Sequence, residues 1–183
     1  MTRPEAGKQK NGLLRFDLTS LPTGASIASA TLHLTTDTSS DDHIATVHRM
    51  LTNWDEANAS WNSPGNGDWQ SGTFGSNDYD GTSYGTFVPV EKDVQLSVNV
   101  TDLVNAWING GVPNYGFLLL AEGSKNRDVK WYSRDEDKEY RRPLLTVEWT
   151  APVTAASIGE TGVPSQEDSA DLNIHLFLPT VNR

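Results

Sequence analysis

Short segments in which apolar and polar residues alternate recur along the chain, with turn residues between them. A period of two residues places alternate side chains on opposite faces of an extended strand. Gly, Pro, Asn, Asp, Ser and Thr fill the gaps between these segments and favour turns. We therefore expect an all-β fold of antiparallel strands. The clearest strand-like segments are GLLRFDL (12–18), ASATLHLTTD (28–37), VQLSVNV (94–100), YGFLLLAEG (115–123), DVKWYSRD (128–135) and PLLTVEW (143–149).

Two stretches depart from this alternation. TDLVNAWING predicts one short helix over about residues 101–109, with Thr101 or Asp102 as its cap and Gly110 at its end. Residues 53–87 are rich in Gly, Asn, Asp and aromatic side chains and show little periodicity. A long irregular stretch in a compact domain often has a function.

Charge and composition exclude several classes of protein. The chain has 24 acidic and 14 basic residues, a formal net charge of −10, and no cysteine. Binding to nucleic acid or to an anionic membrane surface is therefore not expected, because phosphate contacts need a basic face. No apolar run approaches the roughly 20 residues of a membrane span. The first residues, MTRPEAGKQK, do not form a signal peptide in this numbering.

Six segments, in the same order, resemble the DNRLRE-type domain of secreted bacterial and archaeal proteins. They are LLRFDLTSLPTGASIASATLHL, WDEANASWN, VNVTDLVNAWINGG, NYGFLLLAEG, WYSRDED and RPLLTVEW. That group is similar to disaggregatase-related repeats and to an alginate-binding type of carbohydrate-binding module. The resemblance covers roughly residues 11–149. It implies a jelly-roll β-sandwich, a location outside the cell or on its surface, and no catalysis by the domain itself.

The resemblance also suggests that the sandwich lacks a strand, since members of the group have one or more strands before LLRFDL. Here we expect a polar N-terminal extension (1–10), the jelly-roll domain (11–149), a linker (150–170) and a detached C-terminal strand (171–183). In this last strand, alternating apolar side chains are expected to enter a sandwich core. They are Leu172, Ile174, Leu176 and Leu178.

The terminal strand has three interpretations. It inserts into a neighbouring copy, which would build a head-to-tail filament by donor-strand addition. It inserts into its own domain, or it serves as an attachment tag. The first interpretation predicts a non-catalytic extracellular structural subunit whose partners are copies of itself. The rival class is a carbohydrate-binding module of a larger secreted enzyme or adhesin.

The irregular stretch supplies the candidate ligand-binding residues. Trp69, Phe74, Tyr79 and Tyr84 are aromatic rings that could stack on sugar faces, cover the sandwich or contact a neighbouring subunit. The tryptophans that lie in the segments resembling the DNRLRE-type domain are expected in the core; they are Trp54, Trp61, Trp107, Trp131 and Trp149. A protein this acidic is a poor partner for an anionic glycan such as alginate.

Cofactors and catalysis are not expected, with one alternative. Asp78 and Asp80 precede Gly81 and offer oxygen ligands of the kind that Ca²⁺ takes, although the EF-hand pattern fails at both ends. An Asp- and Gly-rich turn also forms without a metal. Carboxyl groups such as those of Asp55 and Glu56 are glycosidase candidates only by number, and are more simply explained as loop surface.

Overall fold

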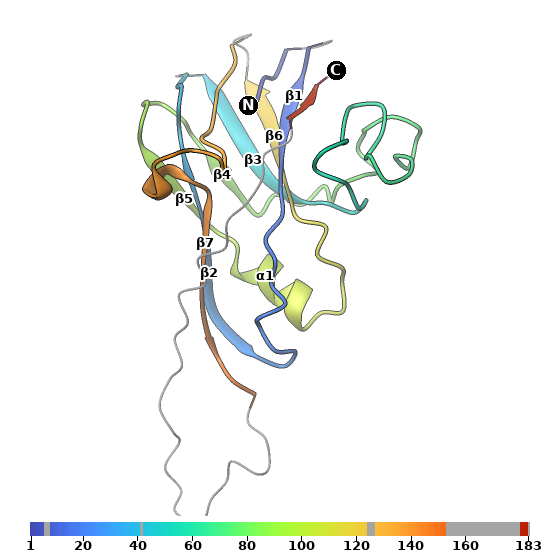
Figure 1. Ribbon diagram of the computed structural model, residues 1–183, viewed down its shortest axis with the longest axis vertical. Helices are drawn as coiled ribbons and strands as arrows, with labels where there is room; N and C mark the ends of the chain where they lie inside the picture. The colour runs from blue at the N-terminus through green and yellow to red at the C-terminus, as the bar shows by residue number, and fades with distance from the viewer. Residues whose placement is uncertain (6–7, 41, 124–126, 153–179, 183) are drawn as a thin grey trace, which may run out of the picture.

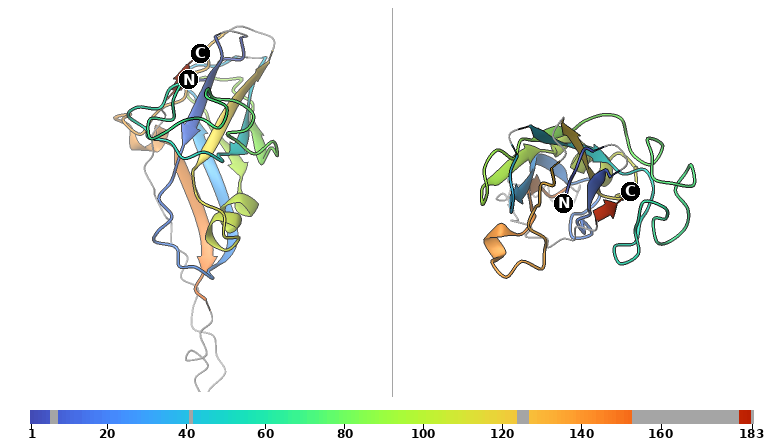
Figure 2. Two further views of the ribbon diagram at one scale, coloured as in Figure 1. Left: turned by 90° about the vertical axis from the view of Figure 1, so that its right-hand side faces the viewer. Right: turned by 90° about the horizontal axis from the view of Figure 1, so that it is seen from above.

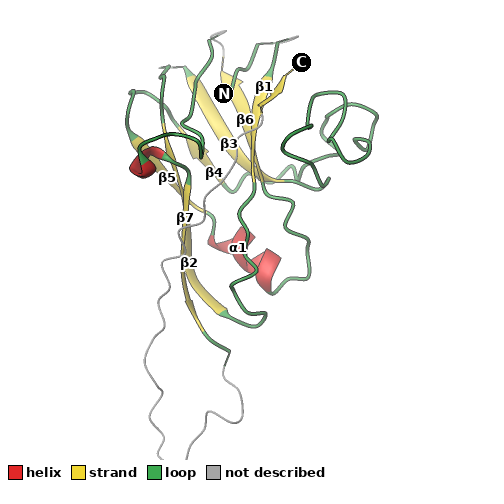
Figure 3. Ribbon diagram, in the orientation of Figure 1, coloured by secondary structure: helices red, strands yellow, loops and turns green. Residues whose placement is uncertain are grey.

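The computed structural model describes residues 1–5, 8–40, 42–123, 127–152 and 180–182. Within them the chain forms two antiparallel sheets that face each other, with one helix at an end (Figures 1 and 3). The elements are β1 (Lys10–Leu14), β2 (Ser26–Thr35), β3 (His43–Arg49), β4 (Gly85–Phe87), β5 (Gln95–Asn99), α1 (Thr101–Ile108), β6 (Phe117–Gly123), the 3₁₀ turn η1 (Glu139–Arg141), β7 (Leu144–Thr150) and β8 (Thr180–Asn182). The expected all-β sandwich with one short helix is confirmed, and the jelly-roll connectivity stays a prediction.

The larger sheet has the order β4-β3-β6-β1-β8, and the smaller sheet has the order β5-β2-β7. The main core lies between them, and both sheets contribute alternate side chains to it. From β2 these are Ala30, Leu32 and Leu34, all with no exposed surface. The alternation of apolar and polar residues in the sequence therefore predicts correctly which side chains of β2 face the core.

Two strands of the larger sheet are buried on both faces. In β6, the consecutive residues Phe117, Leu118 and Leu119 have no exposed surface, and the same holds for Leu13 and Leu14 of β1. Leu13 and Leu118 point away from the main core into a second apolar cluster, which also contains Met50. Continuous apolar runs in these two strands reflect this double burial.

We call residues 53–84 the aromatic segment; it supplies the cover for that outer face. It extends as loops beside the larger sheet and forms no strand or helix (Figures 1 and 3). Its rings of Trp54, Trp69 and Phe74 complete the second cluster with Leu13 and Leu118. The segment is thus held by apolar contacts rather than by a backbone ladder.

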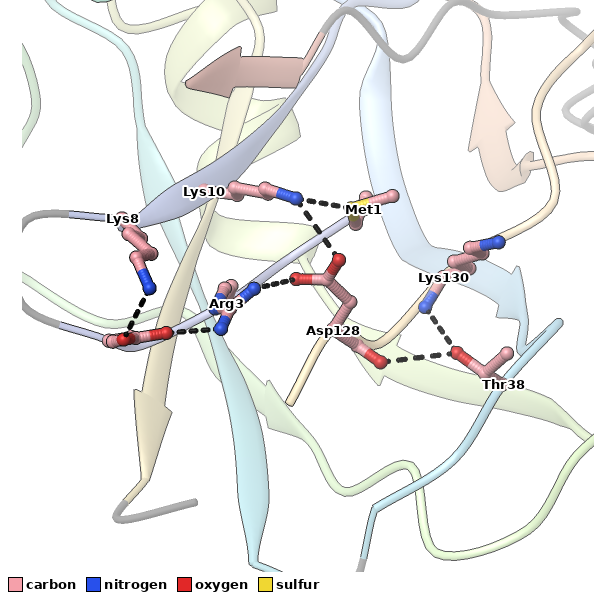
Figure 4. A network of polar contacts seen from close by, with 8 residues as sticks. Met1, Arg3, Lys8, Lys10, Thr38, Asp128 and Lys130 are labelled. Atoms are coloured by element: carbon pink, nitrogen blue, oxygen red, sulfur yellow. Dashed lines mark hydrogen bonds and ion pairs between the residues drawn. The ribbon is translucent and has the colours of Figure 1, made fainter. Parts of the chain in front are cut away.

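The N-terminal residues take part in the fold, although they were expected to form a polar extension. Thr2 is fully buried and forms a β-bridge with Val129. The Asp128 carboxylate accepts hydrogen bonds from Lys10 Nζ at 3.0 Å and Arg3 Nη1 at 3.4 Å (Figure 4). Because residues 127–131 engage in such isolated bridges, the strand expected around DVKWYSRD does not form as a continuous element.

The end of the chain pairs with the start of the same chain. Strand β8 lies antiparallel to β1, with Asn182 opposite Lys10 and Thr180 opposite Gly12. The expected donor side chains Leu172, Ile174, Leu176 and Leu178 lie outside the described residues, as does most of the expected linker.

Candidate functional site

A cleft of about 610 Å³ opens beside the aromatic segment, between the chain that leaves β1 and the helix α1. We call it the Arg15 cleft. Its lining residues are Arg15, Phe16, Asp17, Leu18, Thr19, Trp54, Glu56, Trp107, Ile108 and Asn114. Such a combination of apolar surface with a few polar groups is typical of small-molecule sites.

The floor of the cleft is apolar and tightly packed. Phe16, Trp54 and Trp107 are buried. The ring of Phe117 contacts Phe16 edge-on at 6.1 Å between centroids and Trp107 at 4.8 Å. These edge-to-face contacts fix the rings that form the base of the cleft.

Local backbone geometry brings the turn after α1 against β1. Gly116 has φ +85°, and a Cβ atom at this position would collide with the carbonyl oxygen of Leu14. Asn114 fixes the same turn, because its Nδ2 donates to the Phe16 carbonyl at 2.8 Å and its Oδ1 accepts from the Gly116 N–H at 3.0 Å. Gly116 therefore permits the close approach that forms one wall of the cleft.

The rim carries one guanidinium and two carboxyl groups. The Arg15 guanidinium lies 5.0 Å from the centroid of the Trp54 ring and donates to Asn53 Oδ1 at 2.7 Å. The Trp54 indole N–H in turn donates to the Tyr115 carbonyl at 2.7 Å. This cation–π contact holds Arg15 over the aromatic floor.

The two carboxyl groups of the rim have different environments. Burial raises the pKa of Glu56 above its ordinary value. Hydrogen bonds from the Thr19 side chain and backbone lower the pKa of Asp17. Asp17 and Thr19 are exposed, whereas Glu56 is half-buried. The rim thus offers both donors and acceptors within reach of one bound molecule.

One donor of the floor lacks a protein acceptor. The Trp107 Nε1–H is buried and has no hydrogen-bond partner among the residues that the structure describes. A buried unpaired donor costs about 1–3 kcal/mol. Because this nitrogen has no accessible surface, it is the ring of Trp107 and not its N–H that lines the cleft. Sequence reasoning placed Trp107 in the core, which is correct, but gave no sign of the unpaired N–H.

The aromatic side chains expected to bind glycan do not form this site. Trp69 and Phe74 are 2% and 4% exposed and contact each other edge-on at 5.1 Å. Tyr79 stacks on Phe74 at 6.0 Å, and Tyr84 packs against the main core; both are half-buried. In this conformation the four rings pack against the sandwich, which is one of the three roles considered for them.

Asp78 and Asp80 are engaged by protein donors rather than turned toward a shared space. The Asp78 carboxylate is fully buried and accepts from Thr52 Oγ1 at 2.7 Å, Gln70 N at 2.9 Å and Gly75 N at 3.0 Å. Asp80 pairs with Arg49 at 3.0 Å. In the described part of the chain, no group of three or more His, Asp or Glu side chains could hold a metal ion.

Sequence reasoning missed most of the cleft. Glu56 was considered only as one carboxyl group among many, and Arg15 was not singled out. A signal was available in the adjacent residues NWDE, where an aromatic ring sits beside acids. However, the pairing of Trp54 with Arg15 across 39 positions depends on the packing of the aromatic segment on β1.

Comparison with known proteins gives one match. The family model of carbohydrate-binding module family 96 matches residues 2–148. No curated protein and no solved structure matches the chain. The match covers most of the sandwich and most of the described residues. It agrees with the expected relation to a carbohydrate-binding module, while the DNRLRE-type assignment itself is not confirmed.

The described residues contain no helix that is both long and apolar enough to cross a membrane. The matched range includes every residue that lines the Arg15 cleft and both sheets apart from β8 and the last residues of β7. This chain belongs to carbohydrate-binding module family 96.

Proposed function

We propose that the protein is a non-catalytic extracellular module that binds a neutral polysaccharide in the Arg15 cleft. The observation that carries this proposal is a 610 Å³ cleft whose apolar floor of Phe16, Trp54 and Trp107 lies under a polar rim. Family membership supports the carbohydrate class of the ligand. Modules of this kind bind sugar without catalysing a reaction, which is the alternative function expected from the sequence.

The chemistry of the cleft suits a sugar ring. A pyranose has an apolar C–H face and a periphery of hydroxyl groups, and the cleft has an apolar floor with a polar rim. Arg15 carries five N–H donors, more than its hydrogen bond to Asn53 uses. Glu56 and Asp17 offer acceptors for hydroxyl groups. Each class of group on the ligand therefore has a counterpart in the cleft.

Charge favours a neutral ligand over a polyuronate. The cleft has one guanidinium against two carboxyl groups, and the whole chain has a net charge of −10. An anionic polymer would meet repulsion both at long range and at the rim. We therefore infer that neutral polysaccharides bind in preference to anionic ones.

The test is affinity electrophoresis in native gels that contain galactomannan, hydroxyethylcellulose or polygalacturonate. The wild type should be retarded by at least one of the two neutral polymers and less by polygalacturonate. Arg15→Ala and Glu56→Ala should each reduce retardation about tenfold in apparent affinity, the effect of losing about 1.4 kcal/mol. Lys8→Ala is the matched control, since Lys8 is exposed and lies outside the cleft.

Thermal melting of each variant separates lost binding from lost folding. Wild-type protein that migrates freely in all three gels contradicts the proposal. So does an Arg15→Ala variant that folds and is retarded like the wild type.

A second candidate function is assembly through exchange of the terminal strand. The pairing of β8 with β1 supports it, because the edge of β1 accepts a strand in a defined antiparallel register. In the single chain this pairing is internal; a neighbour could offer the same strand to the same edge. Light scattering during gel filtration of concentrated protein tests this candidate. Polymers in the wild type that disappear in Val181→Pro support exchange, and a wild-type monomer at all concentrations rules it out.

A further inference from the structure

Tyr140 is the one aromatic side chain that is exposed among the described residues. It is 69% exposed, whereas every other described aromatic ring is buried or half-buried. It lies in η1, on the turn that leads into β7. A single exposed ring is common on protein surfaces, so the groups around it decide whether it marks a binding surface. Covering its apolar face would gain free energy.

The ring of Tyr140 belongs to an ordered polar cluster. The Arg141 guanidinium lies 4.7 Å from the centroid of Tyr132 and 5.7 Å from that of Tyr140. It also forms ion pairs with Asp93 at 3.1 Å and Glu136 at 3.8 Å. We call Asp93, Tyr132, Tyr140 and Arg141 the Tyr140 surface.

Asp93 links this cluster to the loop between β4 and β5. The Tyr132 hydroxyl donates to Asp93 Oδ1 at 2.6 Å and accepts from Arg141 Nη1 at 3.0 Å. The hydrogen bond that Tyr132 donates to Asp93 raises the pKa of the Tyr132 phenol to about 12. Three separate segments of the chain therefore position Arg141 beside the exposed ring, which reduces the ordering cost of binding there.

The position of this surface differs from that of the Arg15 cleft. η1 and the aromatic segment lie on opposite sides of the sandwich, and Figures 1 and 2 both show this arrangement. Trp54 and Glu56 of the aromatic segment line the cleft, whereas the Tyr140 surface involves none of the cleft residues. One bound sugar ring therefore does not contact both.

We propose that the Tyr140 surface is a second contact site for neutral polysaccharide, so that one module binds two segments of polymer. The open face of Tyr140 packs against the C–H face of a sugar ring, and Arg141 and Asp93 exchange hydrogen bonds with its hydroxyl groups. The cationic Arg141 is balanced by Asp93 and Glu136, which suits an uncharged ligand. This proposal rests on the proposed function, since it takes the same class of ligand.

Two contact sites have a consequence that one site lacks. A polymer that occupies both gains effective concentration for the second contact, which raises apparent affinity by about 10²-fold or more when the geometry allows it. Two polymers bound to one monomer are cross-linked instead. Either result needs Tyr140, whereas the affinity of the cleft for a short oligosaccharide does not.

The experiment compares Tyr140→Ala, Tyr140→Phe and Val90→Ala with the wild type, using galactomannan and hydroxyethylcellulose as polymers. Val90 is the control because it is apolar, 56% exposed and in the loop that carries Asp93. Tyr140→Ala should weaken retardation by polymer about tenfold or more. It should also abolish any rise in turbidity or viscosity on mixing. Tyr140→Phe, which keeps the ring, and Val90→Ala should behave like the wild type.

Calorimetry with manno- and cello-oligosaccharides separates this proposal from the function of the cleft. Tyr140→Ala should leave the affinity of the cleft for oligosaccharide unchanged, whereas Arg15→Ala should weaken it about tenfold. Polymer binding by Tyr140→Ala equal to that of the wild type overturns the second site and leaves the cleft intact. Loss of polymer binding in Tyr140→Ala alone, with Arg15→Ala unaffected, overturns the cleft and keeps the Tyr140 surface. A wild type that binds neither polymer overturns both.

Discussion

His43 shows how a residue of ordinary appearance in the sequence becomes a buried neutral base. Its side chain is 1% exposed, and its Nε2 lies 2.8 Å from Thr2 Oγ1. Since Thr2 Oγ1 accepts from the Trp131 indole N–H at 3.1 Å, its own proton is free to be donated to His43 Nε2. This arrangement favours an unprotonated ring, and burial lowers the pKa of His43 to about 4.

A pH dependence of stability follows from His43. The folded pKa lies below the unfolded value of about 6.5, so the unfolded chain binds a proton first as the pH falls. The free energy of unfolding should therefore decrease by about 2–3 kcal/mol between pH 6.5 and 4. NMR titration of the His43 ring protons checks the cause, with a midpoint near pH 4 expected. A midpoint near 6.5 contradicts the burial argument.

Asp78 is expected to be structural rather than a cation ligand. Asp78→Ala leaves the N–H groups of Gln70 and Gly75 and the Thr52 hydroxyl without their acceptor. We expect a loss of about 3 kcal/mol or more in denaturant unfolding, from the desolvation cost of these groups. Asp80→Ala, which breaks a partly exposed ion pair with Arg49, should cost about 1 kcal/mol or less.

A chelator supplies the complementary result. Wild-type protein should melt at the same temperature with and without EGTA. A clear fall in melting temperature on chelation, or an Asp80→Ala variant as damaged as Asp78→Ala, would favour the calcium alternative. The sequence could not decide this, because an Asp- and Gly-rich turn looks the same whether its carboxylates hold a metal or backbone donors.

At the scale of elements, the aromatic segment is a cover built from side chains. Trp69 packs against Phe74, and its indole N–H donates to the Ser60 carbonyl at 2.9 Å. Trp69→Ala should lower the free energy of unfolding by about 3–5 kcal/mol, the usual cost of truncating a buried Trp. Trp61→Ala is the matched comparison, since Trp61 contacts Phe74 from a half-buried position and should cost less.

Unfolding curves of the two variants settle the role of these rings. If Trp69→Ala keeps wild-type stability but loses retardation in polysaccharide gels, the ring binds glycan and the covering role is wrong. The opposite pattern, unstable protein with binding retained at low temperature, supports the structure.

Elements with regular alternation were predictable from sequence, and those held by distant partners were not. β2 and β7 alternate, and α1 has an apolar stripe of Leu103, Val104 and Trp107. The expected cap at Thr101 or Asp102 is wrong, because the helix begins at Thr101, after Val100, and no side chain caps that position. By contrast, the segment around Trp131 reads as a strand but forms only bridges, to Thr36 and, at Val129, to Thr2. Those partners lie far away in the sequence, so local pattern alone does not specify the pairing.

At the start of the chain, too, residues pair with distant partners that the local sequence pattern does not predict. Residues 1–10 show no apolar alternation, yet Thr2 and Arg3 find partners in Val129 and Lys10. At the other end, β8 pairs with β1 within the same chain. The alternating residues on which a terminal strand was expected lie outside the described residues, and neither the bounds of β8 nor its pairing with β1 was predictable from local pattern.

At the scale of the whole molecule, charge and architecture act together on the choice of ligand. A net charge of −10 repels polyuronates over a distance of about 10 Å at moderate salt, whereas neutral polymers are unaffected. The aromatic segment, which contributes Trp54 and Glu56 to the cleft, and η1, which contains Tyr140, lie on opposite sides of the sandwich (Figure 2). Any residual retardation by polygalacturonate should grow as salt is raised from low ionic strength, while retardation by galactomannan should not change. The reverse dependence would point to cationic recognition.

The central claim is that sugar binds over Arg15 and Trp107. The most direct measurement is a two-dimensional NMR titration of isotope-labelled protein with manno- and cello-oligosaccharides. The account predicts that the largest shifts fall on the amides of residues 15–19 and 54–56 and on the Trp107 indole N–H, because the Trp107 ring lines the cleft. Shifts that leave the Trp107 indole and Arg15 unmoved while other surfaces respond would contradict it.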